Sequence, residues 1–222
     1  MKSKKTREKI LDTSLELFNS RKASNVSTVQ ISAAMKINPG NLYYYYANKE
    51  DVIRCIWEER MADRHALLMK NTKTINTPKE LLEYIEECFA YMIEYRFFYT
   101  ELSTLFANDE ELIDVYEGTV ALERDSLTAL VVRLSEADLF VEGAGLDKVM
   151  AVQNAVAAAI QMVGRYDAYM HKNIGYDEFI GYCLIRTVYA FDNIMTDKMK
   201  EIMDEELSAI GYPKEKYMEI IK

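Results

Sequence analysis

The sequence predicts an all-α protein, and three observations support this prediction. Glycine and proline are scarce, with eight and three among 222 residues. No segment combines the alternation of a strand with a hairpin turn. Helix start signals recur along the chain, each an N-cap residue followed by a good helix opening. Half of the residues are apolar, enough for one medium core and one small core.

The first part of the chain contains three helix starts within a short distance. Ser27 and Gln30 have the spacing of a capping box. Asn38 is an N-cap residue followed by Pro39 at the first helical position, where the missing N–H costs nothing. Asn48 is a third N-cap, followed by acidic residues that favour a helix start. The spacing predicts helix, tight turn, helix, tight turn and long helix, which is a helix-turn-helix arrangement.

The short helix after that proline carries four consecutive tyrosines, the last of which is Tyr46. One helix cannot bury four consecutive residues on one face, so at least two must face outward. Leu42 and Tyr46 are spaced to point inward, and Gly40 and Tyr44 lie on the opposite face. Tyrosine hydroxyls and N-terminal amides can donate to phosphates, and Asn41 could read a base edge. The alternative is that the tyrosines are core aromatics.

Charge is divided unequally along the chain. Residues 1–54 hold ten lysines and arginines against five acidic residues, a net of +5, which leaves −14 for the remainder of a chain of net charge −9. A positive N-terminal part can bind DNA while the acidic remainder is repelled. Lys5 lies in a basic arm that could reach a neighbouring phosphate; the alternative is a disordered solubilising tail.

The run from Lys5 to Ile56 resembles the DNA-binding domain of TetR-type (TetR/AcrR) bacterial transcriptional regulators. The matching pieces are Arg7-Glu8-Lys9-Ile10-Leu11 with Leu17-Phe18, Ile31-Ser32-Ala33-Ala34, Pro39-Gly40-Asn41-Leu42-Tyr43-Tyr44-Tyr45-Tyr46 and Asn48-Lys49-Glu50. The resemblance implies that the helix 39–46 enters the major groove. It also implies that Tyr43, Tyr44 and Lys49 hold phosphates.

Three departures from the family pattern are visible. Lys36 replaces the usual glycine of the turn, so a non-glycine residue is expected at positive φ. Pro39 replaces a frequent lysine, and Tyr45 replaces a more usual histidine, so the operator sequence cannot be copied from a relative. The candidate DNA-contacting residues are Lys5, Ser27, Thr28, Asn38, Pro39, Gly40, Asn41, Tyr43, Tyr44, Tyr45 and Lys49.

We expect a helix-turn-helix domain over residues 1–48 and a helical ligand-binding and dimerisation domain over residues 49–222. A helix over about 49–70 connects the two. A further helix is expected from Pro78, capped by Thr77, to Tyr95, and another from a cap at Asn108 or Asp109 to residue 137. The remaining helices are expected over 97–106, 146–172, 176–196 and 197–210. A loop is expected over 140–145, and a terminal turn begins at Pro213.

Two late segments, 149–163 and 179–195, are apolar on most sides of the helix. Such a helix must be covered on more than one side, here by its own domain and by a second copy. The resemblance likewise implies a dimer formed through the last two long helices, and a two-fold dimer predicts a pseudo-palindromic operator. The alternative is a central helix buried within one monomer. The candidate interface residues are Ala151, Ala155, Ala158, Ala159, Tyr182, Ile185 and Tyr189.

The region from Tyr91 to Phe106 is rich in aromatic residues, and further aromatic and methionine side chains could face the same interior. Such walls are typical of a pocket for a medium-sized apolar or amphipathic ligand. The alternative for each is an ordinary core position. Gln161 and Arg165 could orient a polar group of a ligand, or equally contact a partner chain or solvent. The candidate ligand-binding residues are Trp57, Met61, Tyr91, Tyr95, Tyr99, Phe106, Tyr116, Gln161, Met162, Arg165 and Tyr166.

The sequence contains no phosphate loop, catalytic triad pattern or metal-ligand spacing, and His65 and His171 are isolated. We therefore expect no enzyme activity, catalytic residue, metal or cofactor. Three widely spaced cysteines suggest reduced thiols in a cytoplasmic protein, and no apolar run reaches membrane-spanning length. The sequence thus predicts a ligand-responsive, dimeric regulator, most simply a repressor. One alternative is control by a protein partner, and another is a ligand-binding or catalytic protein with a vestigial DNA module.

Overall fold

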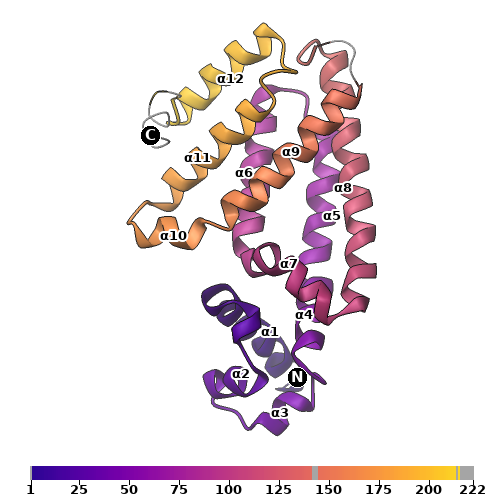
Figure 1. The fold of residues 1–222 in the computed structure, drawn as a ribbon, viewed down its shortest axis with the longest axis vertical. Coiled ribbons are helices and arrows are strands. Elements are labelled where there is room, and N and C mark those ends of the chain that lie inside the picture. Colours follow the sequence, from indigo (N-terminus) through magenta and orange to yellow (C-terminus); the bar gives the residue numbers. More distant parts are fainter. Residues whose placement is uncertain (1, 142–144, 214, 216–222) are drawn as a thin grey trace. The chain divides into compact units, whose positions relative to one another are not determined.

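The structure is a computed structural model that describes residues 2–141, 145–213 and 215. All the regular elements in these residues are helical, and a single antiparallel bridge joins Phe140 to Met195. The predicted all-α class is therefore confirmed (Figure 1). Within the same residues, no helix is both long and apolar enough to cross a membrane.

The chain divides into two compact units. Unit 1 comprises Met1–Ala66 and Tyr95–Val120, and unit 2 comprises Leu67–Glu94 and Ala121–Lys222. Unit 1 thus extends past the domain boundary expected after residue 48. The functional division at that residue stays a prediction.

Unit 1 is built around the first helix and the helix-turn-helix. Its elements are α1 (Lys2–Arg21), η1 (Ala23–Asn25), α2 (Thr28–Met35), α3 (Pro39–Tyr43), α4 (Lys49–Ile56), η2 (Trp57–Met61), α7 (Arg96–Asn108) and the first part of α8 (Glu110–Glu136). Phe18 of α1 lies 5.3 Å from Phe97 of α7 between ring centroids, and both are buried. Apolar burial of this kind is the main force that holds the helices of unit 1 together.

Unit 2 contains α6 (Pro78–Glu94), the remainder of α8, α9 (Gly145–Val163), α10 (Tyr166–His171), α11 (Tyr176–Ala190) and α12 (Asp197–Ala209). In Figure 1, α11 packs against α6 and α9, and α12 packs against α6. The expected cap at Thr77 is present, because its hydroxyl accepts from the N–H of Glu80 at 3.2 Å. Arg133 of α8 donates to the carbonyl of Ile75, which satisfies the backbone before α6.

The expected helix over 49–70 is present as α4, η2 and α5 (Ala62–Asn71), which follow one another without a break. Its middle turn, η2, is π-helical, and such turns often mark functional positions. No sequence signal indicated it.

Several expected helix boundaries were wrong. The segment 146–172 is broken at Gly164 and Arg165 into α9 and α10, since the N–H of Arg165 bonds to Met162 in a tight turn at 2.9 Å. The segment 176–196 ends at Ala190, and the residues that follow turn so that Ile194 pairs with Val141. Of the two caps expected for α8, Asn108 or Asp109, the structure has Asp109, whose side chain accepts from the N–H of Leu112 at 3.3 Å, so that expectation is confirmed. Residues 142–144 of the expected loop, and the terminal segment after Pro213 except residue 215, lie outside the described residues.

Candidate nucleic-acid interface

Local hydrogen bonds fix the start of α2 as predicted. The Ser27 hydroxyl accepts from the N–H of Gln30 at 3.3 Å, and the Gln30 side chain accepts from the N–H of Ser27 at 2.7 Å. These two bonds satisfy amides that a helix start otherwise leaves unpaired. Ser32, one turn later, is buried and donates to the carbonyl of Thr28.

The turn between α2 and α3 contains the left-handed residue expected there. Lys36 has φ 57° and ψ 40°, a conformation that costs a non-glycine residue roughly 1 kcal/mol. Asn38 then caps α3, since its side chain accepts from the N–H of Gly40 at 2.8 Å. Pro39 occupies the first position of the helix. α3 ends at Tyr43, earlier than the expected Tyr46.

Leu42 and Tyr46 point inward, as predicted, and are 0% and 1% exposed. The Tyr46 hydroxyl donates to the carbonyl of Arg7, and the Arg7 guanidinium lies over the Tyr46 ring at 5.4 Å. Burial raises the pKa of Tyr46 well above its ordinary value, so its phenol stays neutral. This tyrosine therefore anchors the segment after α3 on α1.

The opposite face is open. Tyr44 is 79% exposed and Tyr43 is 52% exposed, so the prediction that at least two tyrosines face outward is confirmed. The Tyr43 hydroxyl lies 2.9 Å from Oγ1 of Thr28, which joins the end of α3 to the start of α2. Tyr45 is half-buried and meets the Tyr44 ring edge-on at 5.0 Å. Further exposed residues on this surface are Ser27, Asn38, Pro39, Gly40 and Asn41.

The two candidate lysines differ in their surroundings. Lys5 is exposed on α1. Lys49 is half-buried, and its ammonium donates to the carbonyl of Ala23 at 2.9 Å. A lysine can donate three hydrogen bonds, so this contact leaves two donors for another acceptor.

Two protein-family models match parts of this chain. Residues 10–55 match the model of bacterial regulatory proteins of the tetR family, and residues 60–172 match the model of a bacterial transcriptional repressor, TetR. The chain belongs to the TetR family of transcriptional regulators. No curated protein sequence matches the chain.

Solved TetR-type structures share the fold. A TetR-family transcriptional regulator from Marinobacter aquaeolei has a TM-score of 0.74 at 23% identity, with 92% of this chain and 98% of that chain covered. A ketosteroid transcriptional regulator of Mycobacterium tuberculosis has a TM-score of 0.66 at 14% identity, with coverage of 86% and 96%. The complex of SmeT with triclosan has a TM-score of 0.53 at 19% identity, with coverage of 87% and 93%. SmeT is the repressor of a multidrug efflux pump of Stenotrophomonas maltophilia.

Several contacts that hold the TetR-type helix-turn-helix in place were not foreseen. Glu101 of α7 is 7% exposed and accepts from Ala23 and Ser24 of η1. Arg54 of α4 donates to both carboxylate oxygens of Asp109, at 2.8 and 2.7 Å. A glutamate in the middle of an apolar helix is the only sequence signal that could have indicated the first contact.

The candidate ligand residues are divided between the two units. Six belong to unit 1, and three of these are aromatic neighbours: Trp57 meets Tyr116 at 5.5 Å and stacks on Phe98 at 4.8 Å, and Phe106 meets Tyr116 at 5.2 Å. Met61 and Tyr95 are buried, and Tyr99 is half-buried against Phe98. Nε1 of Trp57 is buried and has no hydrogen-bond partner among the residues that the structure describes.

The other five ligand candidates lie in unit 2. Tyr91 and Met162 are buried there, and Tyr166 is half-buried against Phe179 at 5.2 Å. Gln161 and Arg165 are exposed, which favours the alternative that they face solvent or a partner chain. The ligand-orienting role of these two side chains stays a prediction.

The candidate dimer-interface residues differ in how exposed they are within a single chain. Ala151 and Ala155 are 5% exposed, and Tyr182 and Ile185 are 5% and 3% exposed within a single chain. A side chain already covered in this way has little surface left for a second copy, and the interface role of these four stays a prediction. Ala158, Ala159 and Tyr189 keep partial exposure and stay candidates. The sequence pattern shows that a helix is apolar all round, but not which side its own domain covers.

Proposed function

We propose that this TetR-family regulator binds operator DNA through the open surface of α2 and α3 and the start of α4. The observation that carries the proposal is the pair of outward tyrosines, Tyr43 and Tyr44, beside the exposed Gly40 and Asn41. Phenol hydroxyls donate to phosphates, the absent Cβ of Gly40 permits close approach, and Asn41 can pair with adenine in the major groove.

The remaining predicted contacts support the same surface. Thr28 is held by Tyr43, which places a hydroxyl at the start of α2. Lys49 has two donors beyond its bond to Ala23, and Lys5 adds an exposed positive charge. Residues 1–54 carry a net charge of +5, which favours a polyanion at this end of the sequence.

The proposed state is a homodimer on a pseudo-palindromic operator, because a two-fold dimer presents the same helix to two half-sites. The exposed parts of α9 and α11, including Ala158 and Tyr189, are the proposed contact. As a regulator of transcription, the protein acts where the chromosome is, so we place it in the cytoplasm and assign it no enzymatic role.

We further propose that the protein is a repressor released by a small apolar or amphipathic molecule. Trp57, Tyr116 and their neighbours offer aromatic surface, and the unbonded Nε1 of Trp57 offers a donor to an acceptor on such a ligand. The helix from Lys49 to Asn71 begins at the DNA-binding surface and continues into unit 2. A ligand that binds the two states unequally, by about 1–3 kcal/mol, would shift this helix and weaken DNA binding.

Selection of bound sequences from random duplex DNA tests the proposal. The expected result is a pseudo-palindromic consensus, with affinity falling as salt rises because phosphates are contacted. Tyr44→Ala should weaken binding to the consensus, whereas Glu117→Ala, an exposed change on α8, should not. A ligand screen for release from that consensus then tests the effector. Equal, weak retention of selected and scrambled duplexes by a monomer would refute the function.

A further inference from the structure

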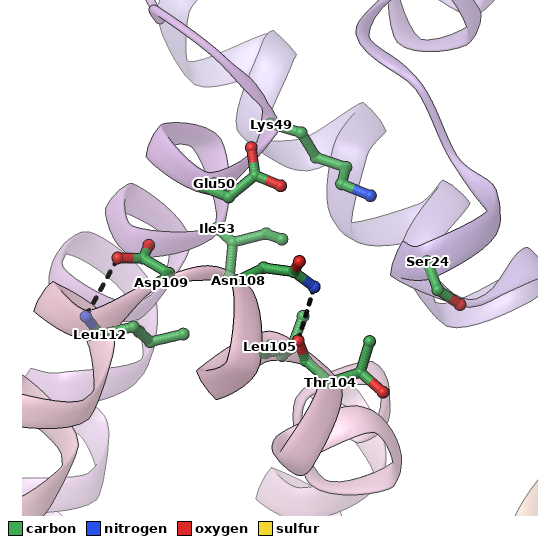
Figure 2. Close-up of a pocket in the computed structure, with 9 residues that line it drawn as sticks. All are labelled: Ser24, Lys49, Glu50, Ile53, Thr104, Leu105, Asn108, Asp109 and Leu112. Atoms are coloured by element: carbon green, nitrogen blue, oxygen red, sulfur yellow. Dashed lines mark hydrogen bonds between the residues drawn. The ribbon is translucent and has the colours of Figure 1, made fainter.

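A pocket of about 160 Å³ lies within unit 1, among η1, α4, α7 and the start of α8 (Figure 2). In this view Lys49 and Glu50 extend from α4 on one side, Asn108 and Thr104 of α7 lie on another, and Ser24 closes a third. An engineered cavity of similar volume holds benzene, so the pocket suits a molecule of about six to ten non-hydrogen atoms.

Groups of opposite charge face this pocket without pairing with one another. The Lys49 ammonium makes one bond, to Ala23, and keeps two donors. The Glu50 carboxylate next to it accepts no hydrogen bond from the described part of the chain. Asp109 differs, because Arg54 and the N–H of Leu112 already occupy its oxygens.

Neutral polar atoms and an apolar wall complete the pocket. The Asn108 side-chain amide donates to the carbonyl of Thr104 at 2.7 Å, which leaves its oxygen as an acceptor. Ile53, Leu105 and Leu112 are 3%, 6% and 1% exposed and form an aliphatic surface. A ligand with only a negative charge would leave the Glu50 carboxylate without a partner. A ligand with only a positive charge would leave two donors of the Lys49 ammonium without an acceptor.

We propose that this pocket binds a small aliphatic amino acid as its zwitterion. The ligand carboxylate accepts from Lys49, its ammonium donates to Glu50 and to the Asn108 oxygen, and its aliphatic group lies on Ile53 and Leu112. L-valine, with about eight non-hydrogen atoms, fits the volume. Each charge-assisted contact is stronger than a neutral hydrogen bond, so both ends of the ligand contribute to affinity.

Binding has a consequence that depends on the proposed function. Lys49 is a proposed phosphate contact, and a ligand carboxylate would compete with DNA for the same ammonium. The plot of log affinity against log salt concentration has a negative slope, and loss of one phosphate contact makes that slope shallower by about 0.9. Bound amino acid should therefore weaken DNA binding and flatten its salt dependence.

Calorimetric titration of the full chain with L-valine tests the site, with 3-methylbutanoate and isobutylamine as analogues that keep one charge each. L-valine should bind about tenfold more tightly than either analogue, as expected for one lost charge-assisted contact. Glu50→Gln should weaken L-valine binding about tenfold and should not weaken 3-methylbutanoate binding. Glu117→Gln is the matched control, because that glutamate is exposed on α8 and does not line the pocket. Unfolding midpoints of both variants report whether either change disturbs the fold.

Absence of saturable L-valine binding overturns the proposal. Equal binding of L-valine and 3-methylbutanoate, or L-valine binding that Glu50→Gln leaves intact in a folded variant, also overturns it. L-valine binding with unchanged DNA affinity overturns the competition for Lys49. The titration needs no DNA, so it tests amino-acid binding independently of the proposed function. A failure of sequence-specific DNA binding would refute the proposed function, and the titration would still show whether the pocket binds L-valine.

Discussion

The carboxylate of Glu101 accepts hydrogen bonds from both the backbone N–H and the hydroxyl of Ser24, 77 positions earlier in the chain. The same carboxylate accepts from the N–H of Ala23. Lys49 meets the carbonyl of Ala23, so both backbone polar groups of that residue have partners outside η1. The connection between α1 and α2 is thus held by α7 and α4 in addition to its own local hydrogen bonds.

Glu101→Ala should destabilise unit 1 by about 2–4 kcal/mol, because it leaves buried amides without an acceptor. Urea denaturation should show a lower midpoint, while Glu117→Ala, an exposed glutamate, should stay within about 0.5 kcal/mol of the original protein. Equal midpoints for Glu101→Ala and the original protein would contradict this role.

Arg54 offers a comparison between a buried and an exposed ion pair. Its Asp109 partner has a side chain that is 5% exposed, and its Glu111 partner has one that is 79% exposed. Asp109→Asn should cost about 3–5 kcal/mol because a partly buried guanidinium loses its partner, whereas Glu111→Gln should cost less than about 1 kcal/mol. Unfolding free energies of the two variants check this. Similar losses for both would show that burial does not decide the contribution of the pair.

Local signals made the helix-turn-helix predictable from the sequence. The caps at Ser27, Asn38 and Asn48 use hydrogen bonds between residues two or three positions apart, so their spacing is visible in the chain. The inward and outward positions of Tyr46 and Tyr44 follow from helical periodicity. These features do not depend on which distant segment packs against them.

Contacts between distant segments could not be predicted in the same way. The partner of Glu101 lies 77 residues away, and nothing in either segment's spacing identifies it. The break at Gly164 and the π-helical turn at Trp57 also depend on tertiary packing that overrides local propensity. The burial of Ala151 and Ala155 within one chain could not be predicted for the same reason, since helical periodicity shows which residues share a face and not which segment covers that face.

The Arg7–Glu59 pair predicts a pH dependence of stability. Hydrogen bonding from Arg7 lowers the pKa of Glu59 below its ordinary value of 4.5. A carboxyl whose pKa is lower when folded stabilises the protein above its unfolded pKa and loses that effect as pH falls through its folded pKa. The stability advantage of the original protein over Glu59→Gln should therefore shrink below about pH 4.5. Both side chains are over one-third exposed, so the effect is small and should shrink further in high salt. Denaturation midpoints of the two proteins across this pH range measure the difference in stability. A difference that grew as the pH fell would contradict the expected direction.

The three cysteines should react slowly in the folded protein. Burial raises the pKa of the Cys55 thiol to about 11 and that of Cys88 to about 12, and it raises the pKa of Cys183 as well. Because the thiolate is the nucleophile, near-neutral pH leaves almost none of the reactive form. A thiol-reactive disulfide reagent should label all three only after denaturant is added. Rapid labelling of the native protein at pH 7 would contradict the raised pKa values of these thiols.

Adjacent members of the tyrosine run should separate DNA binding from folding. Tyr46 is 1% exposed, so Tyr46→Ala should cost about 3–5 kcal/mol of stability through lost core packing. Tyr44 is 79% exposed, so Tyr44→Ala should change stability by less than about 0.5 kcal/mol. Tyr44→Ala should nevertheless weaken binding to the selected operator about three- to tenfold, the usual contribution of one hydrogen bond. Unfolding curves and binding titrations at one fixed salt concentration measure both effects. If Tyr44→Ala left operator affinity unchanged in a fully folded protein, this phenol would not be a DNA contact.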